Sequence, residues 1–334
     1  MIELFSYPFM RRALLAALLT GLIAPAIGTY IVQRRLSLLG DGLGHVAIAG
    51  VGLALLTGQA PIPVAVLVCV SGGVAVELLR QRGKATGDVG LAILFYGGLA
   101  AGVLMSGIAG QGAGALAQYL FGSLTTVSTR DLLVVAALAV VVLVPAIGLA
   151  AQLFAVSSDE EFARTQGLRT GVYNLLIVIL AAITVALAMR TVGLLLVSAL
   201  MVVPVAAAQN LVRGFYAALA AAIVVGVTVS VGGAVASFYA DTAPGALIVV
   251  LAIGVFALSW PISVLFRRRR NVAPVLPEPL EDEVELGAPH VMTEGHPHRH
   301  QPGCGHRVVQ HGDHTDFLHE GHRHAAHADH YDEH

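Results

Sequence analysis

The sequence predicts an all-α membrane protein, a bundle of about eight or nine transmembrane helices followed by a polar tail. Hydrophobic residues make up 56% of the 334 residues, charged residues only 12%, and the mean hydropathy is +0.78, unlike a soluble domain. The apolar residues gather in runs of about 20, the length that a helix needs to cross a bilayer core about 30 Å thick. The 37 glycines are spread among alanines in these runs, which favours helices that pack closely in lipid.

Nine apolar runs have the length of a membrane span. They cover residues 13–33, 36–57, 62–79, 89–109, 131–151, 172–189, 192–211, 216–239 and 244–265. The first run does not have the pattern of a cleaved signal peptide, because it continues to a full span with no small-residue cleavage site before Arg34. Segment 110–130 does not fit the series, and we expect it either to dip into the membrane or to lie along its outer surface.

The Lys and Arg residues predict the orientation, because positive residues are retained on the cytoplasmic side. With nine spans, twelve of them fall at one side of the membrane and four at the other. We therefore expect the amino terminus outside and the carboxyl terminus inside. A tenth crossing within 110–130 would break this alternation.

The composition changes after the membrane-spanning domain, which we place at 1–266. A basic, then Pro-rich and acidic linker covers 267–289, and a tail covering 290–334 holds 13 of the 14 histidines. We expect this tail to be disordered and cytoplasmic. Its imidazoles offer ligands for Zn²⁺, Ni²⁺, Co²⁺ or Cu²⁺, although a solvated tail with no role is the alternative. The tail candidates are His296, His298, His300, Cys304, His306, His322, His324 and His327.

The segment LGDGLGHVAIAG (39–50) places a carboxylate and the only histidine of the membrane part four residues apart. One helical turn separates Asp41 from His45, so both side chains can share one ion. If the second helix begins near Leu36, His45 lies about 13 Å deep. An ionisable residue at such depth is a functional-site hypothesis by default. The alternative is a structural Asp–His pair, and Glu77 is expected to form only a local pair with Arg80.

Residues 157–174, SSDEEFARTQGLRTGVYN, form a polar segment between two apolar runs. We expect one short amphipathic helix, capped by Ser157 or Ser158, with acidic residues in its first turn and Gly167 at its end. An ordinary loop is the alternative. A capped helix outside the membrane is an element on which a partner protein could push.

No catalytic constellation appears in the chain. Lys84 follows Gly83, but Ala85 stands where a phosphate-binding loop requires Ser or Thr. The two cysteines, Cys69 and Cys304, form neither a disulfide framework nor a CxxC motif. We therefore expect neither an ATPase nor another enzyme.

The stretch RRLSLLGDGLGHVAIAG (34–50) resembles the Asp-x-x-x-His motif of the permease subunits of bacterial ABC importers for zinc, manganese and iron, most closely the zinc-uptake permeases. Gly42 stands where Ala often follows the Asp of this motif. Similar segments are DVGLAILF (88–95), QYLFGSL (118–124), VGLLLVSALMVVPVAAA (192–208) and FYADTAPG (238–245), and the resemblance covers about residues 1–265. It implies that Asp41 and His45 bind metal on the transport path. It also implies an ATPase-coupling helix formed by Asp159, Glu160, Glu161, Phe162, Ala163 and Gly167.

By this resemblance the protein is a homodimer in the bacterial inner membrane that works with two ATPase subunits and an extracytoplasmic metal-binding protein. The transported ion is expected to be Zn²⁺, with Mn²⁺ or Fe²⁺ as alternatives. Two other classes stay open, a secondary metal carrier with a His-rich buffering tail and a membrane anchor for a metal store. Tyr239 and Asp241 are candidates for the outer mouth of the path.

Overall fold

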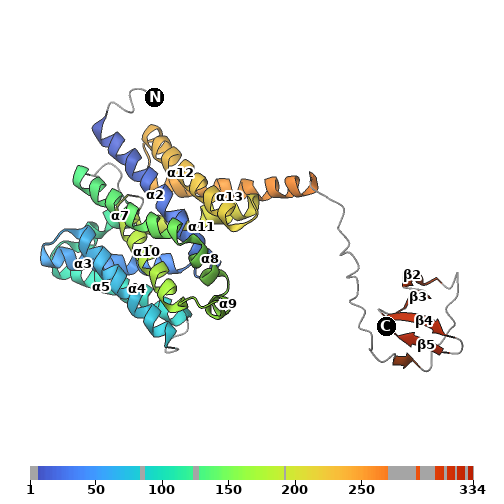
Figure 1. Cartoon of the computed structure of the whole chain (residues 1–334). Helices are drawn as coiled ribbons and strands as arrows, with labels where there is room; N and C mark the ends of the chain where they lie inside the picture. Colours follow the sequence, from blue (N-terminus) through green and yellow to red (C-terminus); the bar gives the residue numbers. More distant parts are fainter. Residues whose placement is uncertain are drawn as a thin grey trace. The chain divides into compact units, whose positions relative to one another are not determined.

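A computed structural model describes residues 7–82, 87–122, 128–191, 193–269, 291–293, 305–311, 314–319, 322–327 and 330–333. The chain divides into two compact units, Met1–Arg270 and Asn271–His334. The described part of the first unit is a bundle of helices, and that of the second is a β-sheet (Figure 1).

Each of the nine predicted apolar runs falls on one helix of the first unit. Eight helices among the described residues are long and apolar enough to cross a membrane, namely α2 (Pro8–Gln33), α3 (Leu39–Thr57), α4 (Pro61–Gln81), α5 (Gly87–Ile108), α7 (Thr129–Gly148), α10 (Thr170–Thr191), α12 (Phe215–Ala240) and α13 (Pro244–Arg269). The ninth, α11 (Leu194–Leu211), has a shorter apolar part. Three further helices are short: α6 (Gly112–Phe121), α8 (Ala150–Ser158) and α9 (Glu160–Thr165).

Local sequence signals set several of the helix ends. Pro8 and Pro61 begin α2 and α4. Proline suits the first position of a helix, because its φ angle is already helical and an N–H at this position would have no partner within the helix. Gly58 ends α3 with a left-handed φ of 69°. Ser128 caps α7 reciprocally, since its Oγ accepts a bond from the Asp131 N–H at 3.1 Å while the Asp131 carboxylate accepts one from the Ser128 N–H at 3.0 Å.

The segment 110–130 contains no tenth crossing in its described part. Its helix α6 has 10 residues and is therefore only about 15 Å long, half of a bilayer core. Leu116 and Tyr119 of α6 are buried in the same hydrophobic core as the long helices. The described part of the segment thus packs against the bundle through α6, which is too short to cross the membrane.

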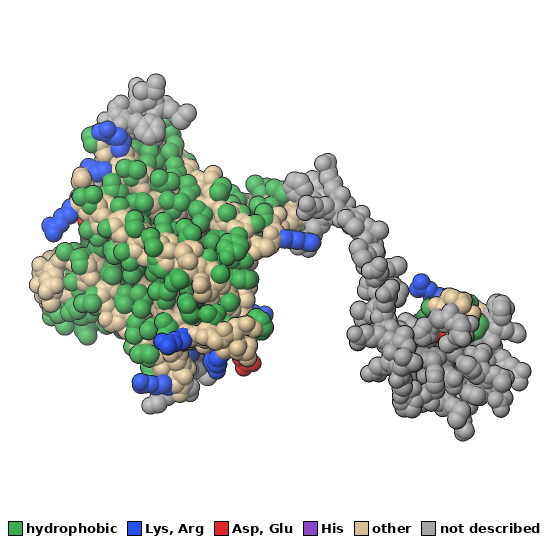
Figure 2. Space-filling view, viewed as in Figure 1, with side chains coloured by type: hydrophobic (Ala, Val, Ile, Leu, Met, Phe, Trp, Pro, Cys, Tyr) green, Lys and Arg blue, Asp and Glu red, His purple; other side chains and the backbone are tan. Residues whose placement is uncertain are grey.

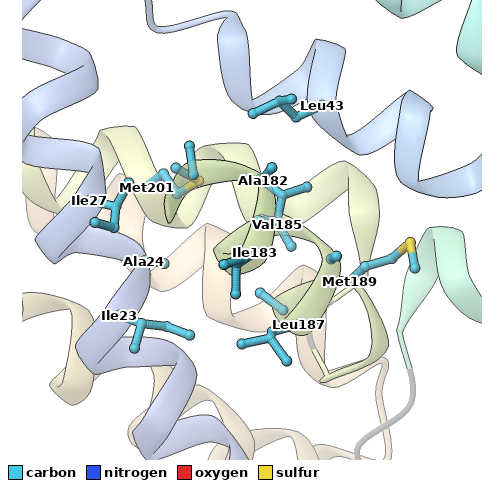
Figure 3. Packing of buried hydrophobic residues seen from close by; sticks show 14 of the residues in the cluster. Ile23, Ala24, Ile27, Leu43, Ala182, Ile183, Val185, Leu187, Met189 and Met201 are labelled. Atoms are coloured by element: carbon cyan, nitrogen blue, oxygen red, sulfur yellow. The ribbon is translucent and has the colours of Figure 1, made fainter. Parts of the chain in front are cut away.

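The core of the bundle lies where α2, α3 and α10 meet. Between 72% and 78% of the residues in the apolar windows of these helices are buried, against 17% in α13. Figure 3 shows Ile23 and Ile27 of α2 beside Ile183 and Leu187 of α10. In the view of Figure 2, hydrophobic side chains cover most of the face of this unit, and the Lys and Arg side chains lie around its margin.

Helices α3 and α5 are in direct backbone contact. A Cβ atom built on Gly98 of α5 would lie 2.6 Å from the carbonyl carbon of His45, and one on Gly102 would lie 2.8 Å from the carbonyl oxygen of Ile48. Real Cβ atoms essentially never approach so closely. Glycine at these two positions therefore fixes how near α5 comes to α3.

The described part of the tail is folded, so the predicted disorder is wrong for these residues. The strands are β1 (Val291–Thr293), β2 (Arg307–His311), β3 (His314–His319), β4 (His322–His327) and β5 (His330–Glu333). They form one antiparallel sheet in the order β1-β5-β4-β3-β2. The prediction relied on polar composition, which does not reveal the hairpin pairing that orders this segment.

The substitution Gly98→Ala should destabilise the bundle, because the added methyl group overlaps the backbone of His45. We expect a loss of about 1–3 kcal/mol, seen as a lower midpoint of thermal unfolding for the purified protein in detergent. The neighbouring Gly97 is the control, since a Cβ there would meet nothing within 4 Å. Equal midpoints for Gly98→Ala and Gly97→Ala would contradict the close packing of α3 and α5.

Candidate metal site

Asp41 and His45 both lie in the first half of α3. The helix begins at Leu39 rather than at the predicted Leu36, so His45 is about 9 Å from its start instead of about 13 Å. Asp41 is in the first turn and partly exposed, whereas His45 is only 7% exposed. The spacing places both residues on one side of the helix, as predicted.

The imidazole of His45 is held in one orientation and one tautomer. Its Nδ1 lies 2.7 Å from the main-chain oxygen of Asp41. A carbonyl oxygen only accepts hydrogen bonds, so Nδ1 carries the hydrogen and donates it, which leaves the Nε2 lone pair available to a cation. The ring of Phe95 from α5 packs against the imidazole with the ring centroids 3.8 Å apart.

The Asp41 carboxylate is not used by this hydrogen bond. The expected alternative of an Asp–His side-chain pair is therefore replaced by a bond from His45 to the main chain of Asp41. Among the described residues, the carboxylate makes no hydrogen bond or ion pair. An unpaired carboxylate one turn from an available imidazole nitrogen is an oxygen and nitrogen donor set that suits a divalent cation.

The glycines around Asp41 bring two other helices close to this turn. A Cβ on Gly42 would lie 3.5 Å from Leu94 Cβ of α5, and one on Gly40 would lie 3.1 Å from Ser198 Oγ of α11. The Ser198 hydroxyl is buried and has no hydrogen-bond partner in the described part of the chain. It is a third polar group beside the Asp41 turn, which sequence reasoning missed because a single serine in an apolar helix carries no recognisable pattern.

Asp41 and His45 of one chain alone would form an incomplete metal site. Within the described residues, no group of three or more His, Cys, Asp or Glu side chains could hold an ion. A closed structural zinc site uses four protein ligands. Two donors per chain fit a site that holds a cation only briefly.

A buried ion network lies at the start of the connection into α3. Arg80 donates to Glu77 through Nε at 2.9 Å and through Nη2 at 2.8 Å, which confirms the predicted local pair. Arg34 joins them, with its Nη2 3.8 Å from Glu77 Oε1. Gln81 donates to Glu77 at 3.1 Å and also to the Gly171 carbonyl of α10 at 3.1 Å. The network therefore ties the residues just before α3 to α4 and α10.

The polar segment 157–174 contains one short helix, α9 (Glu160–Thr165), as predicted, and its first and last residues belong to α8 and α10. Ser157 and Ser158 are the last residues of α8, so neither of the two predicted caps begins α9. Asp159 does, since its Oδ1 accepts a hydrogen bond from the Phe162 N–H at 2.9 Å. Gly167 adopts a left-handed φ of 81° just after α9, where the sequence placed the end of the helix.

Helix α9 has an exposed side and a buried side. Phe162 is 60% exposed, whereas Ala163 is fully buried. Burial lowers the pKa of the Arg34 guanidinium, and the carboxylates of Glu77 and Glu160 raise it. Glu160 of α9 is thus near enough to Arg34 for their charges to interact, and Gln33 also donates to Ser158 of α8 at 3.2 Å.

The remaining candidates are on other elements of the chain. Tyr239 and Asp241 are exposed at the end of α12, where Asp241 is the left-handed C-cap. In the tail, His306 precedes β2, and His322, His324 and His327 are on β4. The other predicted tail residues, His296, His298, His300 and Cys304, lie outside the described residues.

The first unit is an all-α polytopic bundle whose described residues include eight helices long and apolar enough to cross a membrane. Residues 6–263 match the model of the ABC 3 transport family, and the chain belongs to this family. It is a membrane permease component of a metal ABC transporter. This membership supports the prediction of an ATP-driven transporter and gives no support to the alternative of a secondary metal carrier.

Two relatives and one solved structure show how far the similarity extends. The chain is 32% identical to the manganese transport system membrane protein MntC of Halalkalibacterium halodurans, over 77% of this chain and 88% of the relative. It is 29% identical to the high-affinity zinc uptake system membrane protein ZnuB of Haemophilus influenzae, over 77% and 97%. The structure of PsaBC from Streptococcus pneumoniae in complex with Fab matches with a TM-score of 0.71 and 25% identity, covering 80% of this chain and 97% of the matched chain.

The substitution Phe95→Ala should weaken metal handling, because the His45 ring loses the aromatic side chain that holds it. An aromatic contact contributes about 0.5–1.5 kcal/mol, so we expect the half-saturating metal concentration for uptake to rise about 2- to 10-fold. Tyr96→Ala is the control, since Tyr96 is the next residue on α5 and is 71% exposed. If both variants change uptake equally, Phe95 does not act through His45.

Replacing Glu77 by Ala should strongly destabilise the protein, because it leaves Arg34 and Arg80 without their shared carboxylate. The Glu77 side chain is only 4% exposed, and removing one partner of a buried ion pair costs about 3–5 kcal/mol. Thermal unfolding in detergent measures the loss. The exposed Glu161 on α9 provides the matched control Glu161→Ala, which should unfold like the wild type.

Proposed function

We propose that this chain is the membrane-spanning permease of an ATP-driven Zn²⁺ importer and that the ion passes Asp41 and His45. The observation that carries this proposal is the 2.7 Å contact between His45 Nδ1 and the main-chain oxygen of Asp41, which directs Nε2 to other partners one helical turn from the unpaired Asp41 carboxylate. Imidazole nitrogen and carboxylate oxygen are both ligands of zinc. The burial of His45 makes the site selective for a species that can replace lost hydration by direct ligands.

The runner-up is import of Mn²⁺ or Fe²⁺ by the same path. Relatives of the chain are named for manganese, zinc and iron, and the Asp–His donor set suits all three ions. Zinc is favoured by the order of affinity for nitrogen and oxygen ligands. The 13 histidines of the tail are the second argument, because imidazole at this density binds zinc better than manganese.

The incomplete donor set favours a homodimer. One chain contributes a single carboxylate and a single imidazole at α3, whereas zinc takes four ligands. A second copy of α3 would supply the other two. A site shared by two chains assembles and opens as the chains move, which allows both capture and release.

The partners follow from membership of the ABC 3 transport family, and polar surfaces of the chain are candidates for their docking. Two ATPase subunits would dock on α9 of the two chains, where Asp159, Glu160, Glu161 and exposed Phe162 stand beside the Arg34 network. An extracytoplasmic binding protein would deliver the metal at the opposite end, where Tyr239 and Asp241 are candidates for the outer mouth. The chain itself hydrolyses no ATP in this scheme. It lies in the bacterial inner membrane with its tail in the cytoplasm, where the tail binds metal after entry.

The test is metal uptake in cells that lack their own zinc importer, with the ATPase and the binding protein co-expressed. We expect Asp41→Asn and His45→Ala, at equal membrane abundance, to reduce uptake of radioactive zinc by more than about tenfold, as loss of a metal ligand requires. Thr57→Val is the control in the same helix, since Thr57 is exposed at the far end of α3.

Two outcomes would contradict parts of this proposal. Wild-type zinc uptake in both ligand variants would show that the path avoids α3. Uptake of manganese that is competed only weakly by zinc would replace Zn²⁺ by the runner-up ion and leave the site unchanged.

A further inference from the structure

Ser198 of α11 is a buried serine whose hydroxyl does not bond to its own helix. The residue is only 8% exposed, and its Oγ has no hydrogen-bond partner in the described part of the chain. Serine and threonine hydroxyls inside a helix can donate to the carbonyl of the preceding turn. The buried Thr20, Thr29 and Thr184 do so here, at 2.7–2.9 Å. Ser198 departs from this pattern, so its hydroxyl is directed elsewhere.

The Ser198 hydroxyl points to the first turn of α3. From a Cβ atom built on Gly40, Ser198 Oγ would lie at 3.1 Å, Ser198 Cβ at 3.5 Å and Ser198 Cα at 3.6 Å. The oxygen is therefore the nearest of these three atoms to α3. One turn further along α3, a Cβ atom built on Gly44 would overlap the side chain of Leu194. Helix α11 thus lies against this side of α3 over two turns.

The Asp41 side chain leaves α3 between α11 and α5. Successive residues of a helix are about 100° apart around its axis. Gly40 faces Ser198 of α11, and Gly42 faces Leu94 of α5. Asp41 comes between these two glycines in the sequence, so it also comes between them around the helix. Its carboxylate is therefore a neighbour of the Ser198 hydroxyl.

We propose that Ser198 is a positioning residue of the metal site, whose hydroxyl donates a hydrogen bond to the Asp41 carboxylate when the ion binds. This inference rests on the proposed function of Asp41 as a metal ligand. The two groups are complementary, because an ionised carboxylate only accepts hydrogen bonds and a hydroxyl can donate one. Neither has another hydrogen-bond partner among the described residues.

The proposed bond gives each donor of the site its own supporting helix. Carboxylates that bind a metal are in turn hydrogen-bonded by groups around them, which fix their orientation. Here α5 orients the imidazole of His45 through Phe95, and α11 orients the carboxylate of Asp41 through Ser198. The hydroxyl holds one carboxylate oxygen and leaves the other for the ion. Loss of this hydroxyl should therefore weaken ion binding without disturbing the bundle.

The first test measures zinc uptake by Ser198→Ala in cells that lack their own zinc importer, at equal membrane abundance. Removing a hydrogen-bond partner of a metal ligand typically costs 10- to 100-fold in metal affinity, so the half-saturating zinc concentration should rise by about tenfold or more. The maximal rate should keep the wild-type value. Alanine only removes the oxygen atom, so the variant adds no crowding against Gly40.

The matched control is Ser230→Ala on α12. Ser230 is fully buried, and its Oγ also lacks a hydrogen-bond partner within the described residues. Its helix packs on α2 one turn earlier, where a Cβ atom built on Gly226 would overlap Pro25. The control should leave both uptake constants unchanged. If Ser198→Ala behaves like this control, or lowers only the maximal rate, Ser198 has no positioning role and the proposal is wrong.

A second test examines the contact itself and needs neither metal nor transport. The two native cysteines are first replaced by serine (Cys69→Ser and Cys304→Ser) in the full-length protein. Asp41→Cys with Ser198→Cys should then form a disulfide under mild oxidation, because neighbouring residues on closely packed helices reach the Cα separation of about 4.4–6.8 Å that a disulfide requires. Asp41→Cys with Ser230→Cys is the control pair.

Cross-linking of the first pair alone supports the proposal. Equal cross-linking of both pairs, or none in the first pair, would overturn it. Because zinc takes no part in this experiment, such a failure counts against Ser198 alone. The proposed function fails separately, if Asp41→Asn keeps wild-type zinc uptake.

Discussion

The contact between the backbones of α3 and α5 is the constraint on which the metal site depends. Glycine at positions 98 and 102 lets α5 approach until only main-chain atoms separate the two helices. This approach brings Phe95 onto the imidazole of His45. In lipid, helices gain little from hydrophobic burial against one another, so packing of small residues is the main source of such specificity. The orientation of one functional ring thus follows from the absence of two side chains on the neighbouring helix.

A second set of interactions connects this site with the polar surface at α9. Arg34 stands just before α3 and contacts Glu77 of α4, while Glu160 of α9 interacts with the same guanidinium. Arg34 has one buried nitrogen, Nη1, without a partner in the described part of the chain, so its hydrogen-bonding capacity is not exhausted.

Hydropathy and charge predicted the bundle because membrane helices obey two strong rules, apolar length and internally satisfied backbone. All nine apolar runs became helices, and the pair formed by Glu77 and Arg80 was predictable from a spacing of three residues. Phe95, Ser198 and Arg34 were not predicted as partners, since contacts between distant helices leave no periodic signal. The prediction that Ser157 or Ser158 caps α9 was wrong, because these serines and the adjacent Asp159 are all residues that can cap a helix, and Asp159 is the cap. The sheet of the tail was missed because its strands are polar and its order comes from pairing in register.

Both donors of the candidate site belong to a single turn of a single helix. Their mutual distance is therefore set by helix geometry and stays constant as long as α3 stays intact, however the other helices rearrange. The affinity for a cation can then be adjusted only by groups that lie outside this turn. In such a protein, the two donors that recognise the ion are fixed by one helical turn. Groups on other elements that approach this turn then set whether the ion is held or released.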